Sequence, residues 1–191
     1  MRYSPEHKAE THRKIVKDAS RRVRSEGLSG AAVSAVMHDN GLTHGGFYKH
    51  FESKDTLLLA ALHDGFHEIA DRLAHAAEQS PPGAGWKAII KTYLSLESCE
   101  HVGRGCPLPA LAPELARAGK EMKGPIFAEL IHYKNRMVPF MPGRRIADKE
   151  RAFFVIFSTM TGAIEIARLL PDRSVQKKVL TAARDFILRS F

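Results

Sequence analysis

The sequence contains little cysteine and no long apolar run. Cys99 and Cys106 are the only cysteines among 191 residues, too few for a disulfide framework, so a reducing compartment such as the cytoplasm is expected. The longest apolar runs cover residues 57–62 and 152–157, whereas a membrane-spanning helix needs about 20 apolar residues. The first residues are charged and lack an apolar core, which predicts that there is no signal peptide.

Signatures of metal and nucleotide chemistry are also missing. The ten histidines are scattered along the chain and no Cys-x-x-Cys pair occurs, so neither a metal site nor a cofactor is predicted. There is no phosphate-binding loop and no Rossmann fingerprint. No nucleophile–base–acid arrangement stands out from chance. The chain is therefore not expected to be an enzyme.

The charge is positive but not concentrated. The formal net charge is +8 and the pI is about 9.7, a balance that favours an acidic partner such as nucleic acid. Residues 1–60 contain ten Lys or Arg against seven Asp or Glu, and the remaining chain contains nineteen against fourteen. The total charge is thus weak evidence for a nucleic-acid partner. Stronger evidence has to come from the positions of the cations within the first 60 residues.

Apolar periodicity predicts an almost wholly helical chain of about nine helices. Ser4 and Pro5 are expected to open the first helix and Gly27 to end it, and a break is predicted over residues 79–85 and another over 139–143. Residues 152–157 would suit a strand taken alone, but their helical flanks favour a buried helix. The remaining helices are expected near 30–40, 43–51, 53–78, 86–96, 108–118, 122–138, 146–170 and 173–191.

Residues 41–55 are the most informative segment, because they combine glycines, histidines, lysines and aromatics between two helical patterns. Two short helices joined at Gly41 form a helix-turn-helix pattern, with Thr43 as the expected cap of the second. Gly45 and Gly46 each cost such a helix about 1 kcal/mol relative to alanine. A helix that a DNA backbone or base edge must approach closely has reason to accept that cost.

Position along this second helix predicts the role of each side chain. Recognition helices place their first residues near base edges, which indicates Thr43 and His44 for base contacts. Tyr48, Lys49 and His50 are expected to face phosphates, which position a protein without reading sequence.

The underside of the segment and the start of the next helix complete this prediction. Phe47 and Phe51, four residues apart, are expected to point inward. Lys54 lies in the first turn of the helix capped by Ser53, where a cation opposes the helix dipole unless a phosphate binds there. The alternative is that Gly45-Gly46 is a loop and the lysines are solvated surface; spacing alone does not decide between the two.

Over about residues 11–59 the chain resembles the DNA-binding signature of TetR-family (tetracycline-repressor-type) regulators. The resemblance implies base-facing roles for Thr43, His44 and Gly45 and phosphate contacts for Tyr48, His50 and Lys54. The family often has Thr or Ser capping its second helix, where this chain has residues 30–32, Gly-Ala-Ala. With Gly46 and Lys49, the predicted DNA-binding set is Thr43, His44, Gly45, Gly46, Tyr48, Lys49, His50 and Lys54.

The same resemblance implies an all-helical homodimer with two domains. A three-helix helix-turn-helix domain over 1–52 would precede a helical domain over 53–191 that binds a small molecule and pairs through the last two long helices. Double-stranded DNA with a palindromic operator, an effector and a second copy of the chain are the expected partners. We expect a repressor released by its effector.

Residues 103–109 (Gly-Arg-Gly-Cys-Pro-Leu-Pro) are the second informative segment. A thiol before a helix, with Arg104 nearby, is expected to have a lowered pKa, and Gly103 and Gly105 would leave it little shielded. Cys106 is therefore a candidate sensor of electrophiles or oxidants, and a Gly-Cys-Pro segment resembles a thiol-sensing branch of the family. The alternative, a small buried residue in a tight loop, stays open.

Aromatic and methionine residues of the C-terminal part could line an effector pocket, although most are expected to be core. The candidates are Trp86, Tyr93, Phe127, Tyr133, Met137 and Met160. Two other functions stay open at this point. One is a non-specific architectural DNA binder, and the other is a small-molecule-binding or thiol-reactive helical protein without DNA binding.

Overall fold

The chain folds into helices, which confirms the predicted all-α class. The computed structural model describes residues 5–191. The α-helices are α1 (Pro5–Glu26), α2 (Val33–Asp39), α3 (Lys54–Glu78), α4 (Gly85–Tyr93), α5 (Leu96–Glu100), α6 (Leu108–Ala116), α7 (Lys120–Met137), α8 (Ile146–Arg168) and α9 (Arg173–Ser190). Short 3-10 helices are η1 (Leu28–Ala31), η2 (His44–Lys49), η3 (Val102–Arg104) and η4 (Val138–Phe140).

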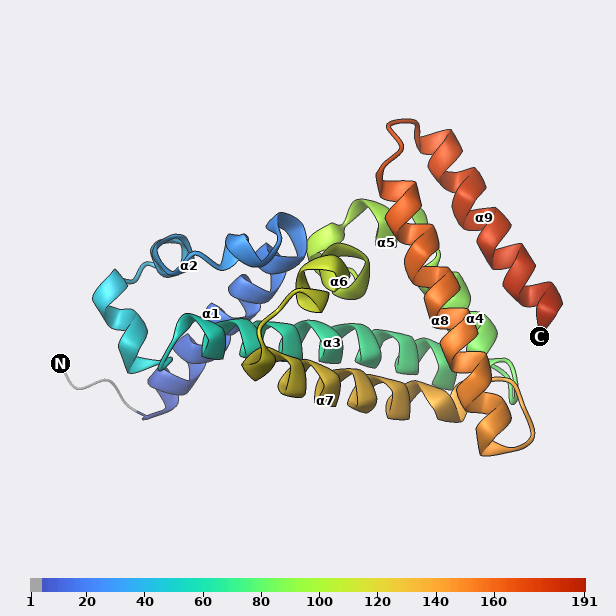
Figure 1. Cartoon of the computed structure of the whole chain (residues 1–191), viewed down its shortest axis with the longest axis horizontal. Helices are drawn as coiled ribbons and strands as arrows, with labels where there is room; N and C mark the ends of the chain where they lie inside the picture. Colours follow the sequence, from blue (N-terminus) through green and yellow to red (C-terminus); the bar gives the residue numbers. More distant parts are fainter. Residues whose placement is uncertain (1–4) are drawn as a thin grey trace.

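The helices form two lobes that share two long helices. Figure 1 shows α1 and α2 at one end of the molecule and α8 and α9 at the other, with α3 and α7 lying side by side between them. One apolar cluster joins α1, α2, η2 and the first half of α3 to side chains of α6 and the start of α7. The second joins the rest of α3 and α7 to α4, α8 and α9. The predicted boundary at residue 53 coincides with the N-cap of α3 and stays a prediction.

Several helix ends lie where their capping residues predict. Gly27 ends α1 with φ 80° and Gly41 follows α2 with φ 69°, a backbone region that favours glycine. Ser53 caps α3, because its Oγ accepts a hydrogen bond of 3.1 Å from the Thr56 amide. The expected cap at Ser4 lies outside the described residues.

Other predicted elements differ from the structure. The helix expected over 86–96 ends at Tyr93, because Leu94 leaves helical geometry at ψ 52° and Ser95 then caps the separate helix α5. The α-helix expected from Ser29 or Gly30 begins only at Val33, after η1. Residues 152–157 lie inside α8, so the helical interpretation is confirmed. Within residues 5–191, no helix combines the length and apolar character needed to cross a membrane.

Candidate nucleic-acid interface and ligand cavity

The segment predicted to read DNA is a 3-10 helix mounted on two buried aromatic rings. Phe47 and Phe51 are 2% and 3% exposed, their ring centroids lie 5.5 Å apart, and Phe51 stacks on His12 of α1 at 4.6 Å. The prediction that both point inward is confirmed. Because η2 packs through these rings, its remaining side chains face solvent.

The outer surface of η2 presents the predicted contact residues. Thr43, His44, Gly45 and Lys49 are exposed, and Tyr48 is 68% exposed. The Tyr48 ring meets Phe47 edge to face at a centroid distance of 5.3 Å. This contact with a buried ring restricts the orientation of the exposed Tyr48 side chain. A large aromatic that faces solvent while anchored from below is suited to contact a partner.

Thr43 occupies the N-cap position of η2 but does not cap it with its side chain. Its backbone is extended (φ −81°, ψ 154°), and within the described chain its hydroxyl makes no capping hydrogen bond. The expectation of a threonine side-chain cap is therefore wrong. The carbonyl of Thr43 instead accepts a hydrogen bond of 2.9 Å from the Gly46 amide.

Gly45 and Gly46 differ in their surroundings. A Cβ atom added to Gly45 would meet nothing within 4 Å, whereas one added to Gly46 would lie 3.6 Å from Met37 Cε. Gly45 is therefore open to an approaching surface, while Gly46 is close to the core side of η2. Neither glycine has the positive φ that would require it.

His50 and Lys54 flank this surface in different electrostatic states. Burial, together with the nearby His12, Lys8 and Lys49 side chains, lowers the pKa of His50. At neutral pH His50 is thus uncharged and can meet a phosphate only as a hydrogen-bond donor. Lys54 is exposed in the first turn of α3, where an anion would be stabilised by the free amides.

The second predicted site, around Cys106, is buried rather than open. Cys106 is 4% exposed, and burial raises the pKa of its thiol. The expected low pKa and exposure are therefore both wrong. A Cβ atom added to Gly103 would lie 2.6 Å from Ser25 Oγ, and one added to Gly105 would lie 2.9 Å from Arg168 Nη2. The glycines let the loop pack against α1 and α8; they do not expose the thiol.

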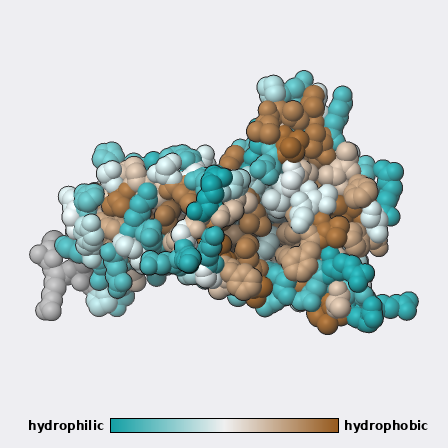
Figure 2. Space-filling view, viewed as in Figure 1, coloured by the Kyte–Doolittle hydropathy of each residue, from teal (hydrophilic) through white to brown (hydrophobic). Residues whose placement is uncertain are grey.

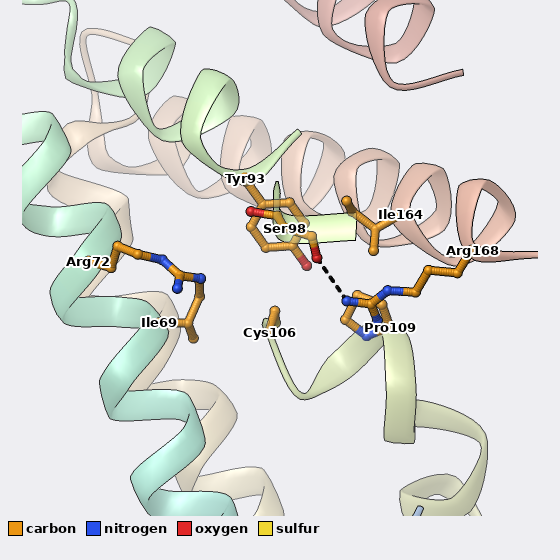
Figure 3. Close-up of a pocket in the computed structure, with 8 residues that line it drawn as sticks. All are labelled: Ile69, Arg72, Tyr93, Ser98, Cys106, Pro109, Ile164 and Arg168. Atoms are coloured by element: carbon orange, nitrogen blue, oxygen red, sulfur yellow. Dashed lines mark hydrogen bonds between the residues drawn. The ribbon is translucent and has the colours of Figure 1, made fainter. Parts of the chain in front are cut away.

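Cys106 lines a small cavity between the helices of the C-terminal lobe. Figure 3 shows Cys106, Tyr93 and Ile164 directed toward this space, with Arg168 hydrogen-bonded to Ser98. The cavity volume is about 10 Å³, room for about one water molecule. Its lining residues are Ile69, Arg72, Tyr93, Ser98, Cys106, Pro109, Ile164 and Arg168.

The six predicted pocket residues do not form a pocket together. Only Tyr93 lines the cavity. Phe127 lies on the surface of α7 with 64% of its area exposed, because the apolar face of α7 that contacts α3 is formed by other residues. The other four belong to the packed core: Trp86, Tyr133, Met137 and Met160.

Arg24 of α1 was not identified from the sequence, although it joins the two lobes. Its guanidinium is 1% exposed and donates to the Gly105 carbonyl at 3.0 Å and to Glu68 Oε2 at 2.7 Å. Nearby, the Leu28 amide donates to Glu114 Oε2 of α6 at 3.0 Å. One arginine among the many of a basic helix carries no pattern that marks it as buried.

Three histidines that were expected to be scattered also come together. His63 and His67 lie one turn apart on α3, and the His67 ring stacks on His132 of α7 at a centroid distance of 4.7 Å. The statement that the histidines are scattered is wrong for these three. The His-x-x-x-His spacing was the available signal, since residues four apart share a helix face.

An exposed helix-turn-helix surface joined to a helical lobe with its own cavity is the arrangement expected of a helix-turn-helix DNA-binding regulator. No protein-family model matches the chain. It is 26% identical over 190 residues to the HTH-type transcriptional regulator TtgR of Pseudomonas putida, covering 90% of this chain and 87% of TtgR.

Solved structures show the same fold along the chain. A TetR transcriptional regulator from Chloroflexus aurantiacus superposes with TM-score 0.77 at 23% identity, covering 96% of both chains. The reduced form of Escherichia coli NemR superposes with TM-score 0.75 at 16% identity, covering 93% of this chain and 95% of NemR. Together with the residue signature at 41–55, these likenesses show that the chain has the fold of TetR-family regulators and is similar along most of its length to an HTH-type transcriptional regulator.

Proposed function

We propose that this regulator is a repressor that binds a palindromic operator as a homodimer and is released by a small-molecule effector. The observation that carries the proposal is the exposed surface of η2, where Thr43, His44, Tyr48 and Lys49 stand above the buried Phe47. Because η2 is anchored by a buried ring, its exposed polar side chains keep fixed positions from which they can contact a DNA duplex. Because the target is chromosomal DNA, we place its action in the cytoplasm.

The contacts divide between base edges and phosphates. Thr43 and His44 are the residues for base edges, since they start η2 and are exposed. Tyr48, Lys49, His50 and Lys54 are the phosphate contacts, and they set the orientation of the protein on the duplex. Gly45 and Gly46 allow the DNA to approach between the two groups, with Gly45 the more open.

The proposed dimer pairs through α8 and α9. Apolar side chains gather over the end of the molecule where these helices meet (Figure 2). In a monomer they would stay exposed to water. A second copy would cover them and place the two η2 surfaces for successive major grooves, about 34–36 Å apart. The exposed apolar residues on these helices, at the turn that joins them and at the C-terminal residue are Ile146, Phe154, Val155, Ile166, Leu169, Val175, Phe186 and Phe191.

The proposed effector enters at the cavity beside Arg168. Arg168 Nε and Nη2 donate to the carbonyls of Cys99 and Ser98, at 3.1 and 3.0 Å. Its buried Nη1 has no hydrogen-bond partner within the described chain, so it is available to a carbonyl or carboxylate oxygen of a ligand. Since the cavity holds about one water, an effector of ordinary size would bind an expanded form.

Expansion of the cavity would reach the DNA-binding lobe through Arg24 and α6. The Gly105 carbonyl that Arg24 binds directly precedes Cys106 in the cavity wall. An effector that favours an expanded arrangement shifts the population away from the DNA-binding one by its difference in affinity for the two. An electrophile admitted by the same opening would meet the Cys106 thiol, and in this form the thiol-sensing role stays part of the proposal.

The test begins by selecting bound sequences from a random duplex pool. Tyr48→Ala is expected to weaken binding to the selected operator at least about tenfold, because it removes a phosphate contact and the exposed ring. Phe127→Ala is the matched control, since Phe127 is an equally exposed aromatic on α7 and should leave affinity unchanged. Fluorescence anisotropy gives both dissociation constants, and sedimentation checks that each variant stays dimeric.

Two results would contradict the proposal. If Tyr48→Ala binds the operator as tightly as the parent, η2 is not the DNA-reading surface. If excess random duplex competes as well as the operator, the protein is a non-specific DNA binder, because salt dependence alone occurs in both cases.

A further inference from the structure

A group of imidazole and carboxylate side chains lies between α3 and α7, away from η2 and from the Cys106 cavity. One potential ligand atom from each of His63, His67 and Glu129 lies within 4.8 Å of the other two. His63 and His67 come from successive turns of α3, and Glu129 faces them from α7. These two helices run side by side along the molecule (Figure 1), so the group is held by two long elements of the fold.

A third imidazole stands next to this group. His132 is one turn beyond Glu129 on α7, and its ring stacks on that of His67 with an interplanar angle of 17°. The rings of His63 and His67 are also close, with centroids 4.0 Å apart. Three imidazoles and one carboxylate are a ligand set that zinc and similar transition metals prefer.

We propose that His63, His67 and Glu129 bind a divalent transition metal ion, with Zn²⁺ as the expected occupant and His132 as the residue able to supply a fourth ligand. The pairing of a His-x-x-x-His face with a Glu-x-x-His face brings all four from two helices. Such a site is independent of the DNA-binding surface and of the effector cavity.

The two carboxylate oxygens of Glu129 suit metal binding. Glu129 Oε1 lies 2.8 Å from His63 Nδ1. Glu129 Oε2 is buried and has no hydrogen-bond partner within the described chain, and a cation would satisfy it.

Only small movements separate the present geometry from a coordinated one. Ligand atoms bound to a tetrahedral zinc ion at about 2.0–2.1 Å lie about 3.4 Å apart. The His63 Nδ1–Glu129 Oε1 pair is closer than this, at 2.8 Å, and the ligand atoms lie at most 4.8 Å apart, so coordination requires the side chains to rotate toward a common centre. The His67 and His132 rings would have to leave their stacked arrangement for both to bind one ion.

The experiment uses the untagged full chain, stripped of metal. Co²⁺ is titrated while its visible absorption is followed, and Zn²⁺ is titrated by calorimetry at neutral pH. We expect one ion per chain and the intense absorption bands of tetrahedral Co²⁺. His67→Ala and Glu129→Gln should each weaken affinity at least about tenfold, and bound Zn²⁺ should raise the melting temperature of the parent but not of these two variants.

His75→Ala is the matched control, because His75 is an exposed histidine of the same helix outside the cluster; it should bind as the parent does. If His67→Ala fails to fold by circular dichroism, His63→Ala replaces it, since His63 is exposed. The proposal is overturned if the parent binds neither ion, or if removing His67 or His63 leaves affinity unchanged. In that case His63 and Glu129 form only a hydrogen-bonded pair.

Discussion

Two glycine-containing segments, residues 41–51 and 103–109, use glycine for opposite purposes. In the first, Gly45 has open space around it and the neighbouring side chains face solvent. In the second, Gly103 and Gly105 stand where a Cβ atom would collide, and the cysteine between their loop and α6 is buried. Glycine in a sequence thus marks a close approach without saying whether a partner molecule or the protein itself approaches.

Substitution of Arg24 is expected to have the largest effect on the second segment. Arg24 of α1 donates a hydrogen bond to the Gly105 carbonyl and so connects α1 to this segment. Arg24→Met leaves that carbonyl and Glu68 without their donor, and we expect a loss of about 3 kcal/mol in the free energy of unfolding. Urea denaturation measures it. Arg21→Ala, at an exposed arginine of the same helix, should change stability by less than about 0.5 kcal/mol; equal losses would contradict the role of Arg24.

A pair of glycine substitutions tests the contrast directly. Gly103→Ala places a Cβ atom 2.6 Å from Ser25 Oγ and 3.1 Å from the Arg21 carbonyl oxygen, and should cost about 2 kcal/mol by overpacking. Gly45→Ala meets open space and should keep or slightly raise stability, since alanine favours helical geometry. Denaturation curves of both variants give the two changes in the free energy of unfolding. A large loss of stability in Gly45→Ala would show that Gly45 is required by the fold.

The burial of the Cys106 thiol in the second segment predicts a pH dependence of the free energy of unfolding. Because burial raises its pKa above the ordinary value of 9.0, the folded state holds the proton more tightly than the unfolded state. Its contribution to stability is complete below that ordinary value and is lost as pH rises through and above it. Denaturation at a series of alkaline pH values should show this decline, and Cys106→Ser should reduce the slope.

Alkylation provides the independent check on Cys106. At neutral pH the folded chain should be labelled at this position at least about tenfold more slowly than the denatured chain, because the thiolate is the reactive species. Mass spectrometry of the labelled peptides gives the rates. Rapid labelling of the folded protein would show that the second segment opens readily.

The smallest expected effect separates Lys49 from His50 on the first segment. His50 has a lowered pKa and is uncharged at neutral pH, whereas Lys49 is an exposed cation. Lys49→Gln should therefore reduce the slope of log affinity against log salt by about one, and His50→Gln should leave it unchanged. Anisotropy titrations over a salt series measure both slopes; identical slopes in the two variants would contradict this assignment.

Much of the fold was predictable because local signals agree with packing. Gly27, Gly41 and Ser53 mark helix ends by backbone or capping chemistry, and the structure confirms all three. The separate helix α5 was missed because the break at Leu94 involves no glycine or proline. The 3-10 geometry of η2 was likewise invisible, since apolar spacing does not distinguish it from one turn of α-helix.

The candidate sites were predictable only where exposure follows from the local pattern. Phe47 and Phe51 are four residues apart, which is close to a helical period, so their inward direction was predicted correctly; the DNA contacts of the exposed residues stay a prediction. The environment of Cys106 depends on its packing against α1, α4 and α8, of which α1 and α8 lie far away in the sequence. The grouping of His67 with His132 depends on the pairing of α3 with α7, which periodicity does not reveal.

The continuity of α3 through both apolar clusters gives it the properties of a lever arm. The helix runs from Lys54 to Glu78, a length of about 37 Å at about 1.5 Å per residue. A tilt of about 5° at the Glu78 end would displace the Lys54 end by about 3 Å. Two such arms in a dimer would change the gap between paired reading surfaces by an amount that a duplex of fixed pitch does not tolerate.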